Sequence, residues 1–188
     1  YLSRGDTPIY LGCCSMSFGA QRNTEIISKA LKMWGGRAVI GKGWGGVKEE
    51  SLPETVFVID RVPHTELFKY VKAVVHHGGA GTTHTGLYAG RPSFAVPQFF
   101  DQPYWGRLIY ELGLGPQPVR LRKLTPHLLA AALDDLSSTP AYVQAAAALS
   151  EKLKLEDGTN RAVDVIEETI ADHGGPKSRD YELLGAAS

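Results

Sequence analysis

The sequence lacks the features that mark several large classes of protein. Its 20 Lys and Arg residues balance 20 Asp and Glu residues, so the formal net charge is zero, which leaves no electrostatic footprint for nucleic acid or anionic lipid. No apolar run approaches the roughly 20 residues that a membrane span requires. The first ten residues also lack the basic and apolar regions of a signal peptide. We therefore expect a cytoplasmic protein with no nucleic-acid partner.

Cysteine is equally scarce. The two cysteines, Cys13 and Cys14, are sequence neighbours, which excludes a disulfide framework and supplies too few ligands for a structural zinc site without histidine. Two adjacent cysteines fit a reducing compartment. The acidic residues show no metal-ligand spacing, so we expect no bound metal. The chain begins at Tyr1, and we expect it to be a fragment of a longer polypeptide.

The sequence does contain an alternation of strand and helix patterns. Its 188 residues, 43% of them hydrophobic, suffice for the core of one domain. The predicted strands are 9–11, 37–40, 55–59, 73–76 and 93–96, and the predicted helices between them are 25–34, 65–70 and 81–89. Helices at 126–136, 140–155 and 159–171 follow, the first two with Thr125 and Thr139 as N-caps. This order predicts an α/β, Rossmann-like parallel sheet with helices on both faces, a domain over residues 1–172 and a flexible tail over 173–188.

A glycine-rich turn follows the most apolar predicted strand. Gly78, Gly79 and Gly81 separate this strand from the next helix, where unpaired amides and the helix dipole favour an anion such as phosphate. A tight turn that needs small residues only for packing is the alternative. His76 and His77 end the strand and should point to opposite faces. We favour His77 as the ligand contact, with a purely structural histidine as the alternative.

A second segment, residues 92–108, adds polar groups at the carboxyl end of the last strand. Pro97 stops this strand, so Asp101 and Gln102 fall at the edge where open α/β sheets bind ligands. A carboxylate beside an amide suits adjacent sugar hydroxyls. The alternative is a solvated loop in which Gln102 caps a helix. Together with the phosphate turn, the pair predicts binding of a nucleotide sugar.

The segment HHGGAGTTHTGLYAGRPSFAVPQFFDQPYWGRLIYELGLGP, residues 76–116, resembles the donor-binding signature of the UDP-glycosyltransferase superfamily, most closely that of the sterol 3-beta-glucosyltransferases. RVPHTELF (61–68) and the opening IYLGCCSMSFG resemble other donor-domain segments of that family, and the similarity covers roughly residues 8–170. It implies the C-terminal half of a two-domain GT-B glycosyltransferase of glycosyltransferase family 1, with UDP-glucose as the donor.

The resemblance implies a role for each matching residue. The diphosphate contacts would be His77, Gly79, Ala80, Gly81, Thr82 and Ser15, the last with a turn residue as the alternative. Asp101 and Gln102 would bind glucose. Arg61 and Val62 would bind uridine, although plant members have tryptophan where Arg61 stands. Thr85 replaces the plant ribose-binding glutamate, so ribose recognition must come from elsewhere.

The catalytic base of this family lies in the N-terminal domain, so we expect no catalytic residue on this chain. The reaction implied is inverting transfer of glucose to the 3-hydroxyl of a sterol or similar lipophilic acceptor, with no metal and no cofactor. The expected partner is an N-terminal acceptor-binding domain of the same polypeptide, and peripheral membrane association through other domains stays open. The alternatives are a donor-binding subunit that needs a separate chain and a non-catalytic UDP-sugar-binding module. A dinucleotide-dependent oxidoreductase is disfavoured, because the glycine turn follows a late strand and no acidic residue ends the next one.

Overall fold

The structure is a computed structural model that describes residues 5–12, 20–41, 49–60 and 62–173. Its elements, in chain order, are β1 (Ile9–Gly12), α1 (Ala20–Trp34), β2 (Ala38–Gly41), η1 (Glu49–Ser51), β3 (Val56–Ile59), α2 (His64–Leu67), η2 (Phe68–Tyr70), β4 (Ala73–His76), α3 (Ala80–Tyr88), β5 (Ser93–Ala95), α4 (Gln102–Glu111), η3 (Leu121–Lys123), α5 (Pro126–Ser138), α6 (Pro140–Lys154) and α7 (Gly158–His173).

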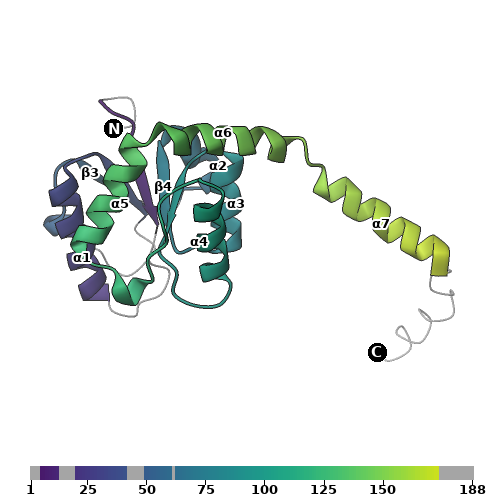
Figure 1. Cartoon of the computed structure of the whole chain (residues 1–188), viewed down its shortest axis with the longest axis horizontal. Coiled ribbons are helices and arrows are strands. Elements are labelled where there is room, and N and C mark those ends of the chain that lie inside the picture. The colour runs from purple at the N-terminus through teal and green to yellow at the C-terminus, as the bar shows by residue number, and fades with distance from the viewer. Residues whose placement is uncertain (1–4, 13–19, 42–48, 61, 174–188) are drawn as a thin grey trace, which may run out of the picture. The chain divides into compact units, whose positions relative to one another are not determined.

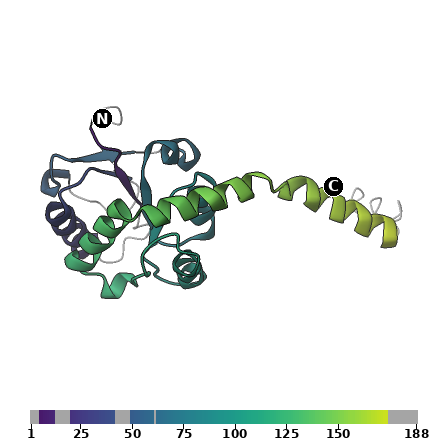
Figure 2. The same ribbon diagram turned by 45° about the horizontal axis from the view of Figure 1, so that its top comes forward.

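Within the described residues, five parallel strands form one sheet in the order β3-β2-β1-β4-β5. In the central pair, Ile9 lies opposite Ala73 and Gly12 opposite His76. Because all strands run the same way, their carboxyl ends meet at one edge of the sheet. Helices lie in front of and behind the strands in Figure 1, and the tilted view in Figure 2 agrees. The predicted α/β architecture is therefore confirmed.

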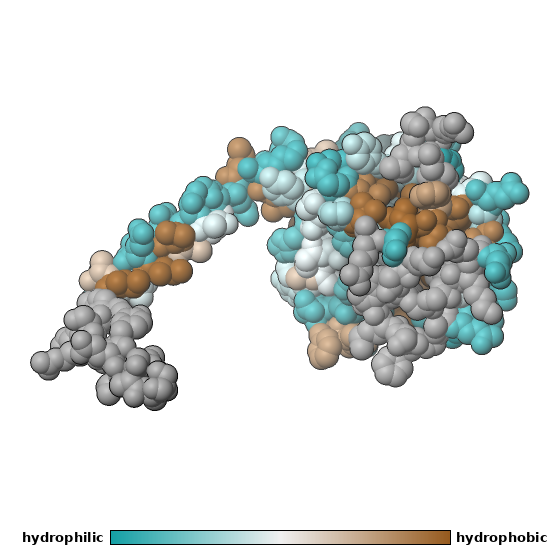
Figure 3. Space-filling view, turned by 180° about the vertical axis from the view of Figure 1, so that it is seen from behind, coloured by the Kyte–Doolittle hydropathy of each residue, from teal (hydrophilic) through white to brown (hydrophobic). Residues whose placement is uncertain are grey.

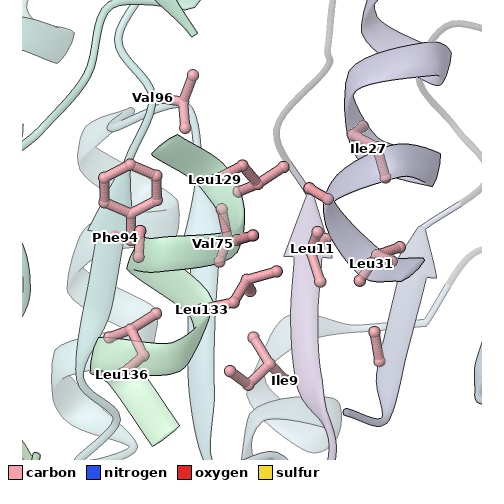
Figure 4. Close-up of a cluster of buried hydrophobic side chains, with 14 of the residues drawn as sticks. Ile9, Leu11, Ile27, Leu31, Val75, Phe94, Val96, Leu129, Leu133 and Leu136 are labelled. Atoms are coloured by element: carbon pink, nitrogen blue, oxygen red, sulfur yellow. The ribbon is translucent and has the colours of Figure 1, made fainter. Parts of the chain in front are cut away.

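The main core lies between one face of the sheet and the helices α1 and α5. Successive strand residues point to opposite faces, so Ile9 and Leu11 of β1 share this side with Val75 of β4. Ile27, Leu31, Leu129 and Leu133 from the two helices pack against them, as Figure 4 shows. The predicted N-cap at the start of α5 is confirmed, because the Thr125 hydroxyl accepts a hydrogen bond from the Leu128 N–H at 3.2 Å.

The opposite face holds a smaller cluster. Tyr10, Val39 and Val74 point to this side and pack against Leu67 and Phe68, which come from α2 and η2. A third cluster joins α3, α4 and α6 to β5. Burial on both faces explains why the central strands are continuous apolar runs rather than alternating ones.

Two predictions of single elements differ from the structure. Helix α1 begins at Ala20, five residues before the predicted start, and α4 was expected only in the alternative in which Gln102 caps a helix. Thr139 was predicted as the N-cap of the next helix. In the structure its hydroxyl donates a hydrogen bond to Asp135 Oδ1 at 2.7 Å, at the end of α5.

The chain divides into two compact units, Tyr1–Leu153 and Lys154–Ser188. In the second unit, α7 carries hydrophobic and hydrophilic residues side by side, coloured brown and teal in Figure 3. The domain boundary predicted between residues 172 and 173 stays a prediction. None of the helices in the described ranges combines the length and the apolar character needed to cross a membrane.

Candidate functional site

The glycine-rich turn lies at the carboxyl edge of the sheet, against the loop that follows β5. Gly78 has a φ of +86°, a left-handed conformation that favours glycine. A Cβ atom at this position would lie 2.9 Å from the backbone oxygen of Gln102. The glycine therefore allows both the turn and the close approach of the two segments. The structure thus brings together the predicted phosphate turn and the predicted sugar-binding loop.

The N-terminus of α3 is open. Gly79 is the N-cap residue and has no side chain to cap the helix, and a Cβ atom on Gly81 would meet no other group within 4 Å. Within the described residues, the N–H groups of Ala80, Gly81 and Thr82 have no hydrogen-bond partner. Uncapped amides at the positive end of a nine-residue helix favour an anion. These are the residues that the sequence predicted as diphosphate contacts.

His76 ends β4 and is completely buried. Its Nδ1 atom accepts a hydrogen bond from the Gly78 N–H at 3.0 Å, so the proton of the neutral ring sits on Nε2. Burial lowers the pKa of His76 from 6.5 to about 3, with smaller contributions from His77 and His64. The Nε2 atom has no partner in the described part of the chain. The turn therefore contains a buried N–H donor that no neighbouring protein group satisfies.

His77 is half-buried beside the same turn. A Cβ atom on Gly79 would clash with His77 Nε2, so the imidazole lies against the N-cap of α3. Burial lowers the pKa of His77, the nearby Asp101 carboxylate opposes this shift, and His64 adds to it. The ring is therefore neutral at pH 7. Its buried Nδ1 atom has no partner among the described residues, and so both histidines of the pair retain hydrogen-bonding capacity.

Asp101 is exposed at the start of α4, and one oxygen of its carboxylate accepts a hydrogen bond from a neighbouring side chain. The Trp105 indole Nε1–H donates to Asp101 Oδ2 at 2.8 Å. Trp105 in turn packs edge-on against His84 of α3, with ring centroids 5.0 Å apart. One carboxylate oxygen is thereby oriented, and no described residue donates a hydrogen bond to the other. Sequence analysis missed Trp105, although its position four residues after Asp101 would have paired the two side chains had the helix been predicted.

Gln102 holds the loop that carries Asp101. Its side-chain oxygen accepts hydrogen bonds from the N–H groups of Gln98, at 2.8 Å, and Phe99, at 3.3 Å. Phe100 has a φ of +54° and its ring is 89% exposed, a strained conformation that costs roughly 1 to 2 kcal/mol. The Gln102 bonds stabilise this strained loop. Its amide oxygen is therefore engaged within the protein, and no described residue accepts a hydrogen bond from its amide nitrogen.

The other predicted contacts divide into two groups. Ser15 and Arg61 lie outside the residues that the structure describes. Val62 is 41% exposed and precedes α2. Neither its N–H nor its C=O hydrogen-bonds to a described residue. The Val62 backbone therefore has one donor and one acceptor that could bind a ligand.

A pocket of about 220 Å³ opens beside the loop after β5. Pro97, Gln98 and Leu121 line it together with the side chains of Arg120 and Arg122. Among the described residues, no group of three or more His, Cys, Asp or Glu side chains could hold a metal ion. Two of the described residues that line this pocket, Arg120 and Arg122, thus carry a positive charge.

The chain is similar to known glycosyltransferases. Residues 45–171 match the family described as erythromycin biosynthesis protein CIII-like, C-terminal domain. Sterol 3-beta-glucosyltransferase UGT80B1 of Arabidopsis thaliana is 41% identical over 167 residues, which are 87% of this chain and 27% of that protein. Vancomycin aglycone glucosyltransferase of Amycolatopsis orientalis is 38% identical over 115 residues, 61% of this chain and 28% of that protein.

Solved structures share the fold. The glycosyltransferase of kitacinnamycin has a TM-score of 0.73 and 26% identity, covering 87% of this chain and 43% of that one. CalG4, the calicheamicin glycosyltransferase, has a TM-score of 0.71 and 23% identity, covering 90% and 43% respectively. The described sheet and helices therefore match the C-terminal domains of GT-B glycosyltransferases. The chain spans about a quarter of the plant relative's length and less than half of each solved structure.

Proposed function

Because the chain belongs to the family of erythromycin biosynthesis protein CIII-like C-terminal domains of glycosyltransferases, we propose that it binds UDP-glucose at the carboxyl edge of its sheet. One observation carries the proposal. The uncapped N-terminus of α3 lies next to a buried, unsatisfied N–H on His76, and the loop bearing Asp101 packs against the same turn. Anion donors and a hydroxyl acceptor meet there, as a sugar diphosphate requires.

Each part of the donor has candidate partners in this proposal. The diphosphate accepts hydrogen bonds from the amides of Gly79, Ala80, Gly81 and Thr82 and from the half-buried His77. Glucose hydroxyls donate to the Asp101 carboxylate, one oxygen of which already accepts a hydrogen bond from Trp105. The Gln102 amide nitrogen adds one donor, and the open backbone groups of Val62 face the edge of uracil.

The proposed reaction is an inverting glucosyl transfer. The acceptor oxygen forms a bond to the anomeric carbon while the bond from that carbon to the β-phosphate oxygen breaks, and UDP leaves with the electron pair. The proton of the acceptor hydroxyl passes to a base outside this chain. Negative charge grows on the departing diphosphate, so the α3 amides and the His77 imidazole stabilise the transition state more than the ground state.

We propose the 3-hydroxyl of a sterol, or of a similar lipophilic alcohol, as the acceptor. Support comes from two Arabidopsis thaliana sterol 3-beta-glucosyltransferases, each 41% identical to this chain. Since the chain spans only 27% of the first of them, the acceptor site and the base belong to an additional N-terminal half. A separate partner chain is the alternative source of that half.

Calorimetry on the chain itself tests donor binding. We expect UDP and UDP-glucose to bind weakly. His77→Ala removes one hydrogen bond to a charged ligand, worth about 1 to 3 kcal/mol, and should weaken both ligands about 5- to 150-fold. Asp101→Ala should spare UDP and weaken UDP-glucose about tenfold. Absence of UDP binding at millimolar nucleotide contradicts the proposal.

Activity is tested by adding the N-terminal half of a sterol 3-beta-glucosyltransferase, either fused to the chain or as a separate protein. Glucose transfer to a sterol only in the fused form supports a single polypeptide. Transfer with separate chains supports the two-subunit alternative. If UDP-glucose binds but neither form transfers glucose, the chain is a binding module and the enzymatic part of the proposal is wrong.

A further inference from the structure

Tyr10 lies across the carboxyl ends of two neighbouring strands. Gly12 ends β1 and Gly41 ends β2. A Cβ atom on Gly12 would lie 2.6 Å from the Tyr10 ring, and one on Gly41 would lie 2.9 Å from its hydroxyl oxygen. Both glycines therefore make room for one aromatic side chain that reaches over the sheet edge. The ring belongs to the buried cluster on this face, and its hydroxyl end lies beside the carboxyl ends of β1 and β2.

The Tyr10 hydroxyl meets His64, the first residue of α2. The distance from the hydroxyl oxygen to His64 Nε2 is 3.1 Å. The imidazole stacks on Phe68, with ring centroids 4.8 Å apart and an interplanar angle of 12°. It also packs edge-on against the Tyr10 ring at 5.4 Å. Two aromatic rings, Tyr10 from β1 and Phe68 four residues further along the chain, thus fix the position and the tilt of the His64 ring.

The backbone before His64 depends on this arrangement. Helix α2 has only four residues, and its N-cap, Pro63, has no side chain that can cap it. The segment reaches α2 from β3, the edge strand of the sheet. Val62, half-exposed and without a backbone partner in the described residues, precedes Pro63 directly. Whatever fixes His64 therefore fixes the donor and acceptor of Val62 as well.

We propose that Tyr10 and His64 are positioning residues for the nucleobase: their hydrogen bond holds the Val62 backbone where it can pair with the edge of uracil. The inference rests on the proposed function, because it assigns an anchor to the uridine end of the same site. Neither residue touches the ligand in this account. The anchor should therefore affect the nucleobase end of the ligand and leave the diphosphate end unchanged.

The electrostatic surroundings agree with this location. A charge on His64 would be felt by both His76 and His77, since His64 lowers the pKa of each. His64 thus lies within electrostatic range of the turn proposed to bind the diphosphate. Burial lowers its own pKa, so the ring is neutral at pH 7 and can share a hydrogen bond with the phenol.

The test compares UDP with inorganic pyrophosphate, which lacks the nucleoside. Tyr10→Phe keeps the ring over Gly12 and Gly41 and removes only the hydroxyl. We expect UDP affinity to fall about three- to tenfold, the value of one hydrogen bond, and pyrophosphate affinity to stay within twofold. His64→Gln, whose amide can reach the place of Nε2, should bind UDP better than His64→Ala.

Tyr142→Phe is the matched control. The Tyr142 hydroxyl donates to Asp135 Oδ2 at 3.0 Å between α5 and α6, so this variant also loses one phenol hydrogen bond. It should lose stability as Tyr10→Phe does but bind both ligands like the wild type. If Tyr10→Phe binds UDP like the control, or loses UDP and pyrophosphate equally, the inference is overturned. If the wild type binds no UDP, the proposed function fails and the inference with it.

Discussion

At the scale of single residues, the neutral state of His76 follows from its place at the end of a buried strand. The imidazole is completely buried and accepts the Gly78 N–H, and both conditions disfavour the imidazolium ion. The unfolded chain has no such constraint, so its histidine titrates near 6.5. His76 therefore links the stability of the fold to pH.

We predict that wild-type stability falls as the pH is lowered. Between pH 6.5 and the folded pKa of about 3, the unfolded state binds a proton that the folded state does not. The contribution of His76 is therefore complete above pH 6.5 and lost at about 1.4 kcal/mol per pH unit below it. From pH 7 to pH 5 the loss is about 2 kcal/mol. Urea unfolding at both pH values measures it.

His76→Asn provides the comparison for this prediction. The asparagine side-chain oxygen can accept the Gly78 N–H as Nδ1 does, but it does not titrate. The difference in unfolding free energy between wild type and variant should shrink by about 2 kcal/mol from pH 7 to pH 5. A difference that does not change with pH would show that His76 is protonated at its ordinary pKa.

At the scale of elements, the turn between β4 and α3 and the loop between β5 and α4 behave as one unit. Gly78 is the point of contact, since its backbone faces the carbonyl of Gln102. Gln102 in turn binds the N–H groups of Gln98 and Phe99. A change at the turn should therefore reach the loop that carries Asp101.

We predict that Gly78→Ala weakens both folding and UDP binding. The left-handed backbone alone costs an alanine roughly 1 kcal/mol, and the contact with the Gln102 oxygen adds to it. Gly113→Ala is the matched variant, because Gly113 has a φ of +66° and no atom within 4 Å of its Cβ position. It should lose about 1 kcal/mol and bind UDP normally. Equal losses in the two variants, by chemical denaturation and calorimetry, would show that the contact has no effect.

The elements differ in how well the sequence predicts them. The strand from Ala73 to His76 and the helix that Thr125 caps were predicted because short apolar runs and local capping determine them. Helix α4 was not the favoured prediction, because four aromatic residues, a proline and a glycine within residues 99–106 obscure the helical period. Without that helix, the bond from Trp105 to Asp101 could not be foreseen.

The local features of the site were predictable from the sequence, but its contacts between distant residues were not. The glycine turn and Asp101 were identified from local sequence, and the structure brings them together. The hydrogen bond between Tyr10 and His64 joins residues 54 positions apart, so it depends on how β1 and α2 meet in the fold. The hydrogen bonds that the Gln102 side chain accepts from the loop likewise depend on which backbone N–H groups the loop leaves unsatisfied. No local pattern encodes either contact.

At the scale of the whole molecule, the hydrophobic core lies within the first unit. Every member of the three buried clusters falls between Ile9 and Leu153. We predict that a chain ending after residue 157 melts within about 2 to 4 °C of one ending after residue 172, a difference worth about 1 kcal/mol. Thermal unfolding followed by circular dichroism measures it. A loss of more than about 10 °C would place α7 in the folding unit, as the boundary at residue 172 requires.

The central claim is that a UDP-sugar binds where the α3 turn meets the loop of Asp101. Its most direct test is a titration of the 15N-labelled chain followed by amide chemical shifts. UDP should move the resonances of Gly78, Gly79 and Gly81. The Trp105 indole N–H, which donates to Asp101, should move further with UDP-glucose than with UDP, since only the sugar reaches that carboxylate. If the ligands bind and leave the glycine amides unmoved, or if the indole responds equally to both, the claim is contradicted.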